Sequence, residues 1–408
     1  MSLSNPGAAT LGAAAPAPAA AFSLTRGGFT HSLLSRFGLV AETPRQVIDR
    51  ILALVLLTWV PMAILAVVQG VAWGPAVRVP FLCDLSVYAR FLIAVPLFVL
   101  AGPVVDRRLA MAVADLESGG IVPAAGRPGF EAALTRLAKW RDSHLPEILL
   151  LGFSFGLSWI STHVPAARVV TNWTILGDGP GSRTSLAATW LHLAAMPLCM
   201  FLMMQWLWRF LVWSGFLWAV SRLNLEPIPT HPDRAGGLMN LGEAHTAFGI
   251  VLAAFAVIIA ARAAVMAHYG GASLDAARGP LVAFVILGFL LAFGPLLLFT
   301  PMLVRARRRG LLEYGQLATS YVRSFDRKWV RGAGSAGEEL LGSGDIQSLA
   351  DMGNSFEVLR TMKPVPIEVR HLIAVALWMV IPMLPMIATV VPLHTMLERL
   401  LALITATR

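Results

Sequence analysis

Long uncharged runs of hydrophobic residues recur along this chain and alternate with segments that carry basic residues. No charged residue occurs over residues 51–70 or over residues 280–304. A helix needs about 20 apolar residues to cross the hydrocarbon core of a bilayer. By this criterion the pattern predicts an all-α, polytopic transmembrane bundle of about seven spans, over residues 51–70, 85–105, 145–163, 185–207, 241–264, 280–304 and 371–391.

The positions of the basic residues predict how these spans are oriented. If the N-terminus is cytoplasmic, residues 26–50, 106–144, 208–240 and 305–370 all face inward and hold 24 of the 32 lysines and arginines. Lys and Arg concentrate on the cytoplasmic side of membrane proteins. Seven spans place the C-terminus outside, but the last span contains prolines that allow it to turn back, so the side of the C-terminus stays open: Pro382, Pro385 and Pro392.

Four regions follow from the same pattern. Residues 1–30 form an Ala/Pro-rich tail that we expect to be disordered, and residues 45–304 contain six spans with a cytoplasmic helical loop at 106–144. Residues 305–370 form a basic cytoplasmic loop whose opening RARRRG favours contact with anionic lipid headgroups. Residues 371–408 supply the seventh span and an amphipathic tail. Helices are expected within the two loops, over residues 130–142 and 345–362.

Composition narrows the class of protein. The chain is 57% hydrophobic and only 13% charged, half the charge of an ordinary soluble domain, so a membrane protein is indicated. The net charge of +9 therefore reflects topology, and we expect the lipid bilayer as partner and no nucleic acid; a homo-oligomer is left open. Cys83 and Cys199 are far apart and predict no disulfide or metal motif. Without a nucleotide-binding motif or a catalytic signature, no cofactor is expected and enzymatic activity is disfavoured.

The stretch PTHPDRAGGL, residues 229–238, is the most polar sequence between two apolar runs. Thr230, His231, Asp233 and Arg234 precede Gly236 and Gly237, just before the fifth span. Backbone amides near a helix N-terminus attract anions, and an arginine adds a bidentate donor, so the stretch predicts a site for an anionic group. The alternative interpretation is a turn, because Thr and Asp cap helices and Pro and Gly shape reversals.

Three other patterns carry weaker chemical interpretations. His231, Asp233, Glu243 and His245 are capable metal ligands but match no compact metal motif, so no metal is predicted. GFSFG, residues 152–156, has the form of a nucleophile elbow but lies within an apolar run, where helix packing is the better interpretation. The aromatic and basic residues after the fourth span are typical of a membrane interface: Trp206, Arg209, Trp213 and Trp218.

Two segments resemble a family of uncharacterised bacterial inner-membrane proteins that share a THPDRAGGL loop. They are RFLVWSGFLWAVSRLNLEPIPTHPDRAGGL and DIQSLADMGNSFEVLRTMKPVP. The resemblance implies a bacterial inner-membrane location and no activity.

Three functional classes remain open. A transport or channel-like protein with a cytoplasmic anion-recognising loop is favoured, because the chain is nearly all membrane and has proline-interrupted spans. Such a protein should need Arg90, Ser154, Ser158 and His192 on mutually facing helices. A scaffold or assembly factor would instead use the 305–370 loop, including Arg323, Arg327, Lys328 and Trp329. An enzyme acting at the inner interface is the third class.

Overall fold

The computed structural model of this chain describes residues 22–36, 38, 43–163, 172–176, 182–269, 274–332, 340 and 343–385. Within these ranges the chain is almost entirely helical. The one sheet found there is an antiparallel pairing of two two-residue strands, β1 (Ile175–Leu176) and β2 (Arg183–Thr184). The first 21 residues of the expected tail, the amphipathic C-terminal segment and the end of the seventh expected span lie outside the described residues.

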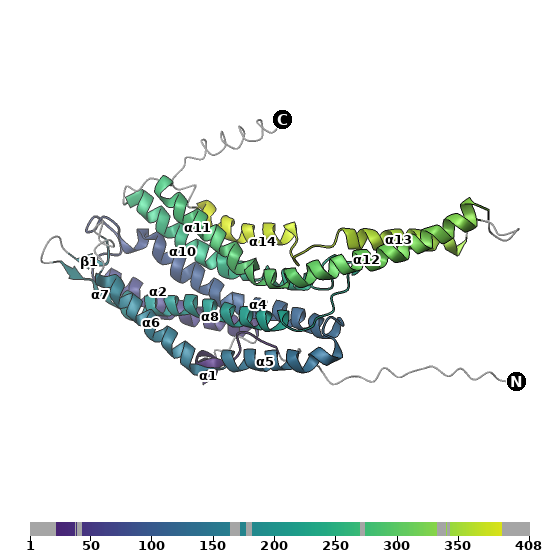
Figure 1. Ribbon diagram of the computed structural model, residues 1–408. Helices are drawn as coiled ribbons and strands as arrows, with labels where there is room; N and C mark the ends of the chain where they lie inside the picture. Colours follow the sequence, from purple (N-terminus) through teal and green to yellow (C-terminus); the bar gives the residue numbers. More distant parts are fainter. Residues whose placement is uncertain are drawn as a thin grey trace, which may run out of the picture.

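The α-helices form a bundle from which a long hairpin projects (Figure 1). The helices of the bundle are α1 (Gly28–Arg36), α2 (Pro44–Val68), α3 (Leu85–Tyr88), α4 (Val95–Ser118), α5 (Arg127–Arg141), α6 (His144–His163), α7 (Leu186–Trp190), α8 (Met196–Ser221), α9 (Met239–His245), α10 (Phe248–Tyr269), α11 (Leu274–Phe293) and α14 (Val369–Val380). The projecting hairpin consists of α12 (Thr300–Phe325) and α13 (Gly344–Arg360).

Tighter and wider helical turns link these helices. The 3₁₀ turns are η2 (Phe81–Cys83), η4 (Ala124–Gly126), η8 (Gly294–Phe299) and η10 (Ile381–Met383). The π-helical turns are η3 (Ala89–Ala94), η7 (Leu191–Ala195) and η9 (Asp326–Val330). The helices expected at residues 130–142 and 345–362 are confirmed as α5 and α13.

Five continuous helical stretches are long and apolar enough to cross a membrane. They cover Pro44–Val68, Leu85–Ser118, Leu186–Ser221, Met239–Tyr269 and Arg278–Val330. These stretches contain five of the seven expected spans. The expected span at residues 145–163 is helical as α6, and the last one begins in the shorter apolar stretch Val369–Met383, but neither belongs to that group. A multi-pass helical membrane protein is therefore confirmed, whereas seven crossings and a cytoplasmic N-terminus stay predictions.

Prolines explain where the spans depart from regular α-helix. Proline lacks an amide donor and its ring clashes with the carbonyl four residues earlier, so the preceding turn must widen or break. Pro96 and Pro197 each occupy the second position of an α-helix that follows a π-helical turn, and Pro295 lies in the 3₁₀ turn η8. Pro61, in contrast, is accommodated inside α2.

Residues 22–30 are ordered, although we expected them to belong to the disordered tail. Ser23 and Leu24 are buried against the bundle. The Asp106 carboxylate accepts hydrogen bonds from the amides of Leu24 (2.7 Å) and Thr25 (3.1 Å) and from the hydroxyls of Ser23 and Thr25 (both 2.5 Å). These four bonds hold the N-terminal segment on α4.

A second carboxylate fixes the following helix. Glu147 on α6 accepts from the amide of Thr30 (2.6 Å) and its hydroxyl (2.9 Å), and from Gln205 Nε2 on α8 (3.1 Å). Gly28 permits this approach, because a Cβ there would come within 3.0 Å of the Glu147 carboxylate. The first turn of α1 is therefore held between α6 and α8.

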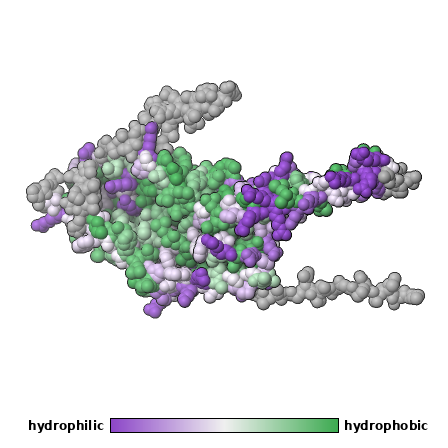
Figure 2. Space-filling view, in the orientation of Figure 1, coloured by the Kyte–Doolittle hydropathy of each residue, from purple (hydrophilic) through white to green (hydrophobic). Residues whose placement is uncertain are grey.

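The projecting hairpin, here called the arm, comprises α12, η9 and α13. Figure 1 shows α12 running from the bundle to the far end of the arm, where α13 returns beside it. The helix is unbroken at residue 305, so the expected boundary between bundle and loop is not a break in structure. Figure 2 shows hydrophobic residues gathered over the bundle and hydrophilic residues over the arm. The arm is thus a hydrophilic extension of an apolar helix.

Candidate functional site

The 229–238 loop is organised around the side chain of Asp233. Its Oδ1 accepts hydrogen bonds from the amides of Ala235 (2.8 Å) and Gly237 (3.1 Å), and its Oδ2 accepts from the amide of Met239 (3.1 Å). His231 Nδ1 lies 2.8 Å from Oδ1. Burial alone would raise the pKa of Asp233, but these hydrogen bonds together lower it below its ordinary value.

The amides that we expected to bind an external anion therefore already bind an internal carboxylate. Arg234 adopts a left-handed backbone (φ +57°), which is uncommon for a residue with a side chain. Gly236 and Gly237 share the left-handed region, with φ of +66° and +91°. The turn interpretation of these residues agrees with this geometry, and any anion would have to bind the exposed Arg234 side chain.

The loop also supports the base of the arm. The amide of Lys363, just after α13, donates to the carbonyl of Arg234 (2.7 Å). A Cβ on Gly236 would lie 3.3 Å from Met362 Cε, and a Cβ on Gly310 of α12 would lie 2.8 Å from Pro229 Cβ. The two sequence segments that carry the family resemblance are thus in contact, and the loop positions both helices of the arm.

The linker from the arm to α14, residues 361–368, contains charged residues next to the contact between the loop and the arm. Glu368 pairs with Lys363 (2.8 Å) and Arg370 (2.6 Å), and the hydrogen bond from Lys363 is the main cause of a lowered pKa at Glu368. His371 Nε2 lies 3.1 Å from Glu243, which is also 3.6 Å from Arg108 on α4. Ionisable groups of α4, α9 and the start of α14 therefore meet next to the linker.

The four metal-capable residues of the sequence do not converge. His231 contacts Asp233, whereas Glu243 contacts His371 and Arg108. His245 is buried and accepts a hydrogen bond from Trp213 Nε1 (2.9 Å) while its Nδ1 lies 2.5 Å from the carbonyl of Ala292. Among the described residues, no group of three or more His, Cys, Asp or Glu side chains is placed to hold a metal ion.

The residues of GFSFG lie within α6, as the packing interpretation requires. Ser154 donates to the carbonyl of Leu150 in its own helix (2.7 Å), and Ser158 donates to the carbonyl of His192 (2.8 Å). Neither serine hydrogen-bonds a histidine side chain in the described part of the chain. Ser158 instead connects α6 to the π-helical turn η7.

The four expected interface residues divide between core and surface. Trp206 and Trp213 are buried inside the bundle, where Trp206 Nε1 donates to the carbonyl of Phe98 (3.0 Å). Arg209 stacks over Trp206, 5.1 Å from the ring centroid. Only Trp218 is exposed, with the guanidinium of Arg222 over its ring. The alternation of Trp and Arg predicted a membrane interface, and for Trp206 and Trp213 this prediction was wrong because both face other helices.

An ionisable pair lies within the bundle at two π-helical turns. Arg90 belongs to η3 and His192 to η7, and their charges are within electrostatic range of one another. Asp84 and Cys199 are also within range of Arg90. His192 Nδ1 is buried without a hydrogen-bond partner in the described structure. Arg90 and His192 are called the interior pair below.

Asp84, whose charge acts on Arg90, holds two segments of the chain together next to the interior pair. Its Oδ1 accepts from the amide (2.9 Å) and hydroxyl (2.6 Å) of Ser86, and its Oδ2 accepts from Trp173 Nε1 (3.0 Å). Trp173 itself is buried against Phe81, with ring centroids 5.1 Å apart. The Asp84 carboxylate thus accepts hydrogen bonds from neutral donors rather than from Arg90.

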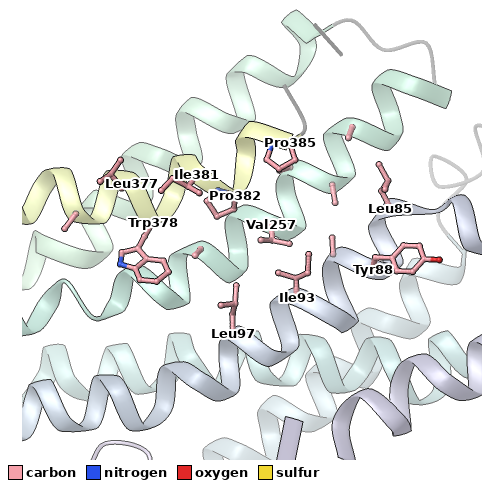
Figure 3. A pocket seen from close by; sticks show the side chains of 16 residues that line it. Leu85, Tyr88, Ile93, Leu97, Val257, Leu377, Trp378, Ile381, Pro382 and Pro385 are labelled. Atoms are coloured by element: carbon pink, nitrogen blue, oxygen red, sulfur yellow. The ribbon is translucent and has the colours of Figure 1, made fainter. Parts of the chain in front are cut away.

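An apolar groove lies on the other side of η3. It has a volume of about 820 Å³ and is lined from the α3–η3–α4 stretch, from α10 and from α14 with the η10 turn that follows it. Figure 3 shows side chains from these elements pointing into it, among them Ile93, Leu97, Val257 and Trp378. Ala89 lines the groove and the next residue, Arg90, belongs to the interior pair, so the η3 turn separates an apolar space from a charged one.

Sequence reasoning identified Arg90, Ser158 and His192 as candidates but missed the carboxylates that hold the N-terminal segment. Asp106 and Glu147 fall at the ends of expected spans, where a charged residue ordinarily meets water. The signal in the sequence that could have identified the donors to these carboxylates is the group of hydroxyl residues Ser23, Thr25 and Thr30. Comparisons with protein-family models, with curated proteins and with solved structures give no match for this chain.

Proposed function

We propose that this protein is a transport or channel-like membrane protein whose solute path passes the interior pair. The observation that carries the proposal is that two π-helical turns, η3 and η7, both pack on α2 and each carries one ionisable side chain, the two charges being within electrostatic range of one another. π-Helical turns within α-helices occur frequently at functional sites. An ionisable residue inside a membrane span is costly and is a candidate functional group by default.

The sign of the charge favours an anionic solute. Arg90 is a permanent cation, and the nearest carboxylate, that of Asp84, is occupied by Ser86 and Trp173. Ser158 ties α6 to the backbone of His192, so α6 also meets the chain at one member of the pair. The proposal extends to a cytoplasmic arm, supported by the distribution of basic residues, and to a bacterial inner membrane, supported by the resemblance of the two segments alone.

Recognition of the solute at the 229–238 loop is proposed only through Arg234. Its guanidinium is exposed, and no partner for it occurs among the residues that the structure describes. Asp233 takes up the amides of Ala235, Gly237 and Met239, which leaves the side chain of Arg234 as the remaining donor of the loop.

A scaffold function is the second candidate, and the arm favours it. Arg323 and Arg327 are exposed on the arm and available to a partner. Lys328 and Trp329 instead bind Asp345 of α13, at 2.9 and 2.8 Å, so they hold the arm together. A partner that docks on the arm should therefore depend on the first two residues.

Anion flux into proteoliposomes tests the transport proposal. Purified protein is reconstituted into vesicles, and the entry of chloride, nitrate or phosphate is measured for the wild type, Arg90→Gln and Arg262→Gln. Arg262 is the matched control because it is exposed on α10 and belongs to neither π-helical turn, although its charge is within electrostatic range of Arg90; it therefore controls for the loss of a positive charge near the pair. We expect flux in the wild type and the control and its loss in Arg90→Gln. Equal flux through the wild type and Arg90→Gln would contradict the proposal, and loss of arm-dependent partner binding in Arg323→Ala with flux unchanged would favour the scaffold.

A further inference from the structure

A small polar chamber lies beneath the N-terminal segment, away from the interior pair. Its volume is about 40 Å³, and it is lined by Thr25, Thr30, His31, Arg50, Pro103 and Arg209 among others. A cavity needs roughly 10–15 Å³ to hold one water molecule, so the chamber has room for about three atoms of the size of a water oxygen. α1, α2, α4 and α8 all contribute to its wall.

Asp106 and Glu147, the carboxylates near the chamber, accept no hydrogen bond from Arg50 or Arg209, two of the three arginines that line it; Arg26 is the third. Asp106 accepts four hydrogen bonds from Ser23, Leu24 and Thr25, and Glu147 accepts three from Thr30 and Gln205. All of these donors are neutral. Both acids act on Arg209 only through the electrostatic field.

The two arginines are consequently left without hydrogen-bond acceptors in the described structure. Arg50 Nε is buried and has no partner, and so is His31 Nε2. The guanidinium of Arg209 is found over the Trp206 ring and donates no hydrogen bond to a described residue. The two cations also repel each other. Enclosed charges are expensive unless a counter-charge and hydrogen bonds compensate them, so the chamber calls for an anion.

We propose that the chamber binds a phosphate group between Arg50 and Arg209. A guanidinium presents a planar fork of donors that matches two oxygens of a phosphate, and two such forks facing one small cavity suit a tetrahedral oxyanion. His31 Nε2 adds a donor from α1 when it carries the ring proton. The group belongs either to free phosphate or to a phospholipid headgroup, since Arg50 lies in the second turn of α2, near the end of an apolar span.

Thermal melting of the detergent-purified, delipidated full-length protein tests binding of inorganic phosphate. The variants are Arg50→Gln and Arg209→Gln, with Arg45→Gln and Arg222→Gln as controls, because those two arginines are exposed on the same helix or at its end. A hydrogen-bonded charge contributes about 1.5–3 kcal/mol, so the Kd for phosphate should rise roughly ten- to hundredfold in each chamber variant. The controls should respond to phosphate as the wild type does.

The lipid source is tested in a parallel arm. Protein reconstituted into phosphatidylglycerol vesicles is extracted again, and the phospholipid retained per protein is counted. Retention by the wild type and both controls, with loss in both chamber variants, identifies a headgroup as the ligand even if inorganic phosphate gives no shift. If neither probe distinguishes the wild type from the chamber variants, the proposal is overturned.

The melting point without phosphate separates binding from a structural role. Arg50→Gln removes a cation whose buried Nε has no acceptor, so this ligand-free variant should be as stable as the wild type or more stable. Arg209→Gln also loses the contact with Trp206 and the attraction of Asp106 and Glu147, so it is left out of this comparison. A large fall in the melting point of ligand-free Arg50→Gln would show that the arginine has an internal partner and would count against the proposal. Loss of anion flux in Arg90→Gln tests the interior pair separately, so the two proposals fail independently.

Discussion

Replacing Asp233 by alanine should release the base of the arm. The substitution leaves three amides without their acceptor, and two of these belong to residues that are themselves buried, Ala235 (0% exposed) and Met239 (5%). A buried donor left unsatisfied costs about 1–3 kcal/mol, so the loop should lose about 3 kcal/mol in total. Arg234, whose carbonyl accepts from the Lys363 amide, follows Asp233 directly, and the loss should reach the arm linker.

Hydrogen exchange measures this loss. A destabilisation of about 3 kcal/mol corresponds to roughly a hundredfold increase in local opening, which should appear at the amide of Lys363 and in residues 359–367. Arg234→Gly is the control, because glycine adopts the left-handed backbone at that position without penalty and should leave exchange unchanged or slower. Unchanged exchange in Asp233→Ala would refute the role assigned to its carboxylate.

The same contact has a definite pH dependence. The pKa of Asp233 is lowered in the folded loop, so its contribution to stability is present above the unfolded value of about 3.9 and is lost as the pH falls through the folded pKa. Exchange at Lys363 should therefore accelerate in acid in the wild type. In Asp233→Ala this acid-dependent part should be absent.

Three further substitutions test other contacts. Gly242→Ala should cost about 1–3 kcal/mol of stability in thermal melting, because its Cβ would overlap a backbone carbonyl of the linker; Gly215→Ala, with open space around it, should be neutral. His245→Leu leaves an indole and a carbonyl unpaired and should lower the melting point by the equivalent of about 2–6 kcal/mol, and a melting point equal to that of the wild type would exclude a bridging role. Hydrogen bonds lower the pKa of Asp345, so the end of the arm should loosen as the pH falls through that folded pKa; a fluorescence titration of Trp329 should show a transition that Asp345→Asn abolishes.

The periodic features of the sequence predicted most of the helices but not the contacts between them. α5 and α13 follow from their patterns, and among the prolines of the apolar runs Pro96, Pro197 and Pro295 lie at or beside interruptions of the α-helix, whereas Pro61 does not. The sequence also predicted a turn at residues 229–238. It did not predict that the Asp233 carboxylate accepts hydrogen bonds from the amides of the loop, because a turn and an anion site require the same glycines.

Contacts across long sequence separations account for the remainder. Ser23 and Asp106 are 83 residues apart, and Thr30 and Glu147 are 117 apart. The hydrophobic pattern of the sequence places Asp106 and Glu147 at the edges of spans, where water would solvate their carboxylates. It carries no information about the N-terminal segment that folds over them. Burial of Trp213 was missed for the same reason, since an aromatic residue near a span end suits both a lipid interface and a helix contact.

The continuity of α12 with the bundle makes the arm a mechanical lever. From Thr300 to Val330 the helix extends about 45 Å at a rise of about 1.5 Å per residue. It starts after the 3₁₀ turn η8, which begins two residues beyond Ala292, the residue whose carbonyl His245 contacts. A change of about 10° in helix direction at that turn would carry the far end through about 8 Å. Small rearrangements among the spans would thus be magnified into displacements large enough for a bound partner to sense.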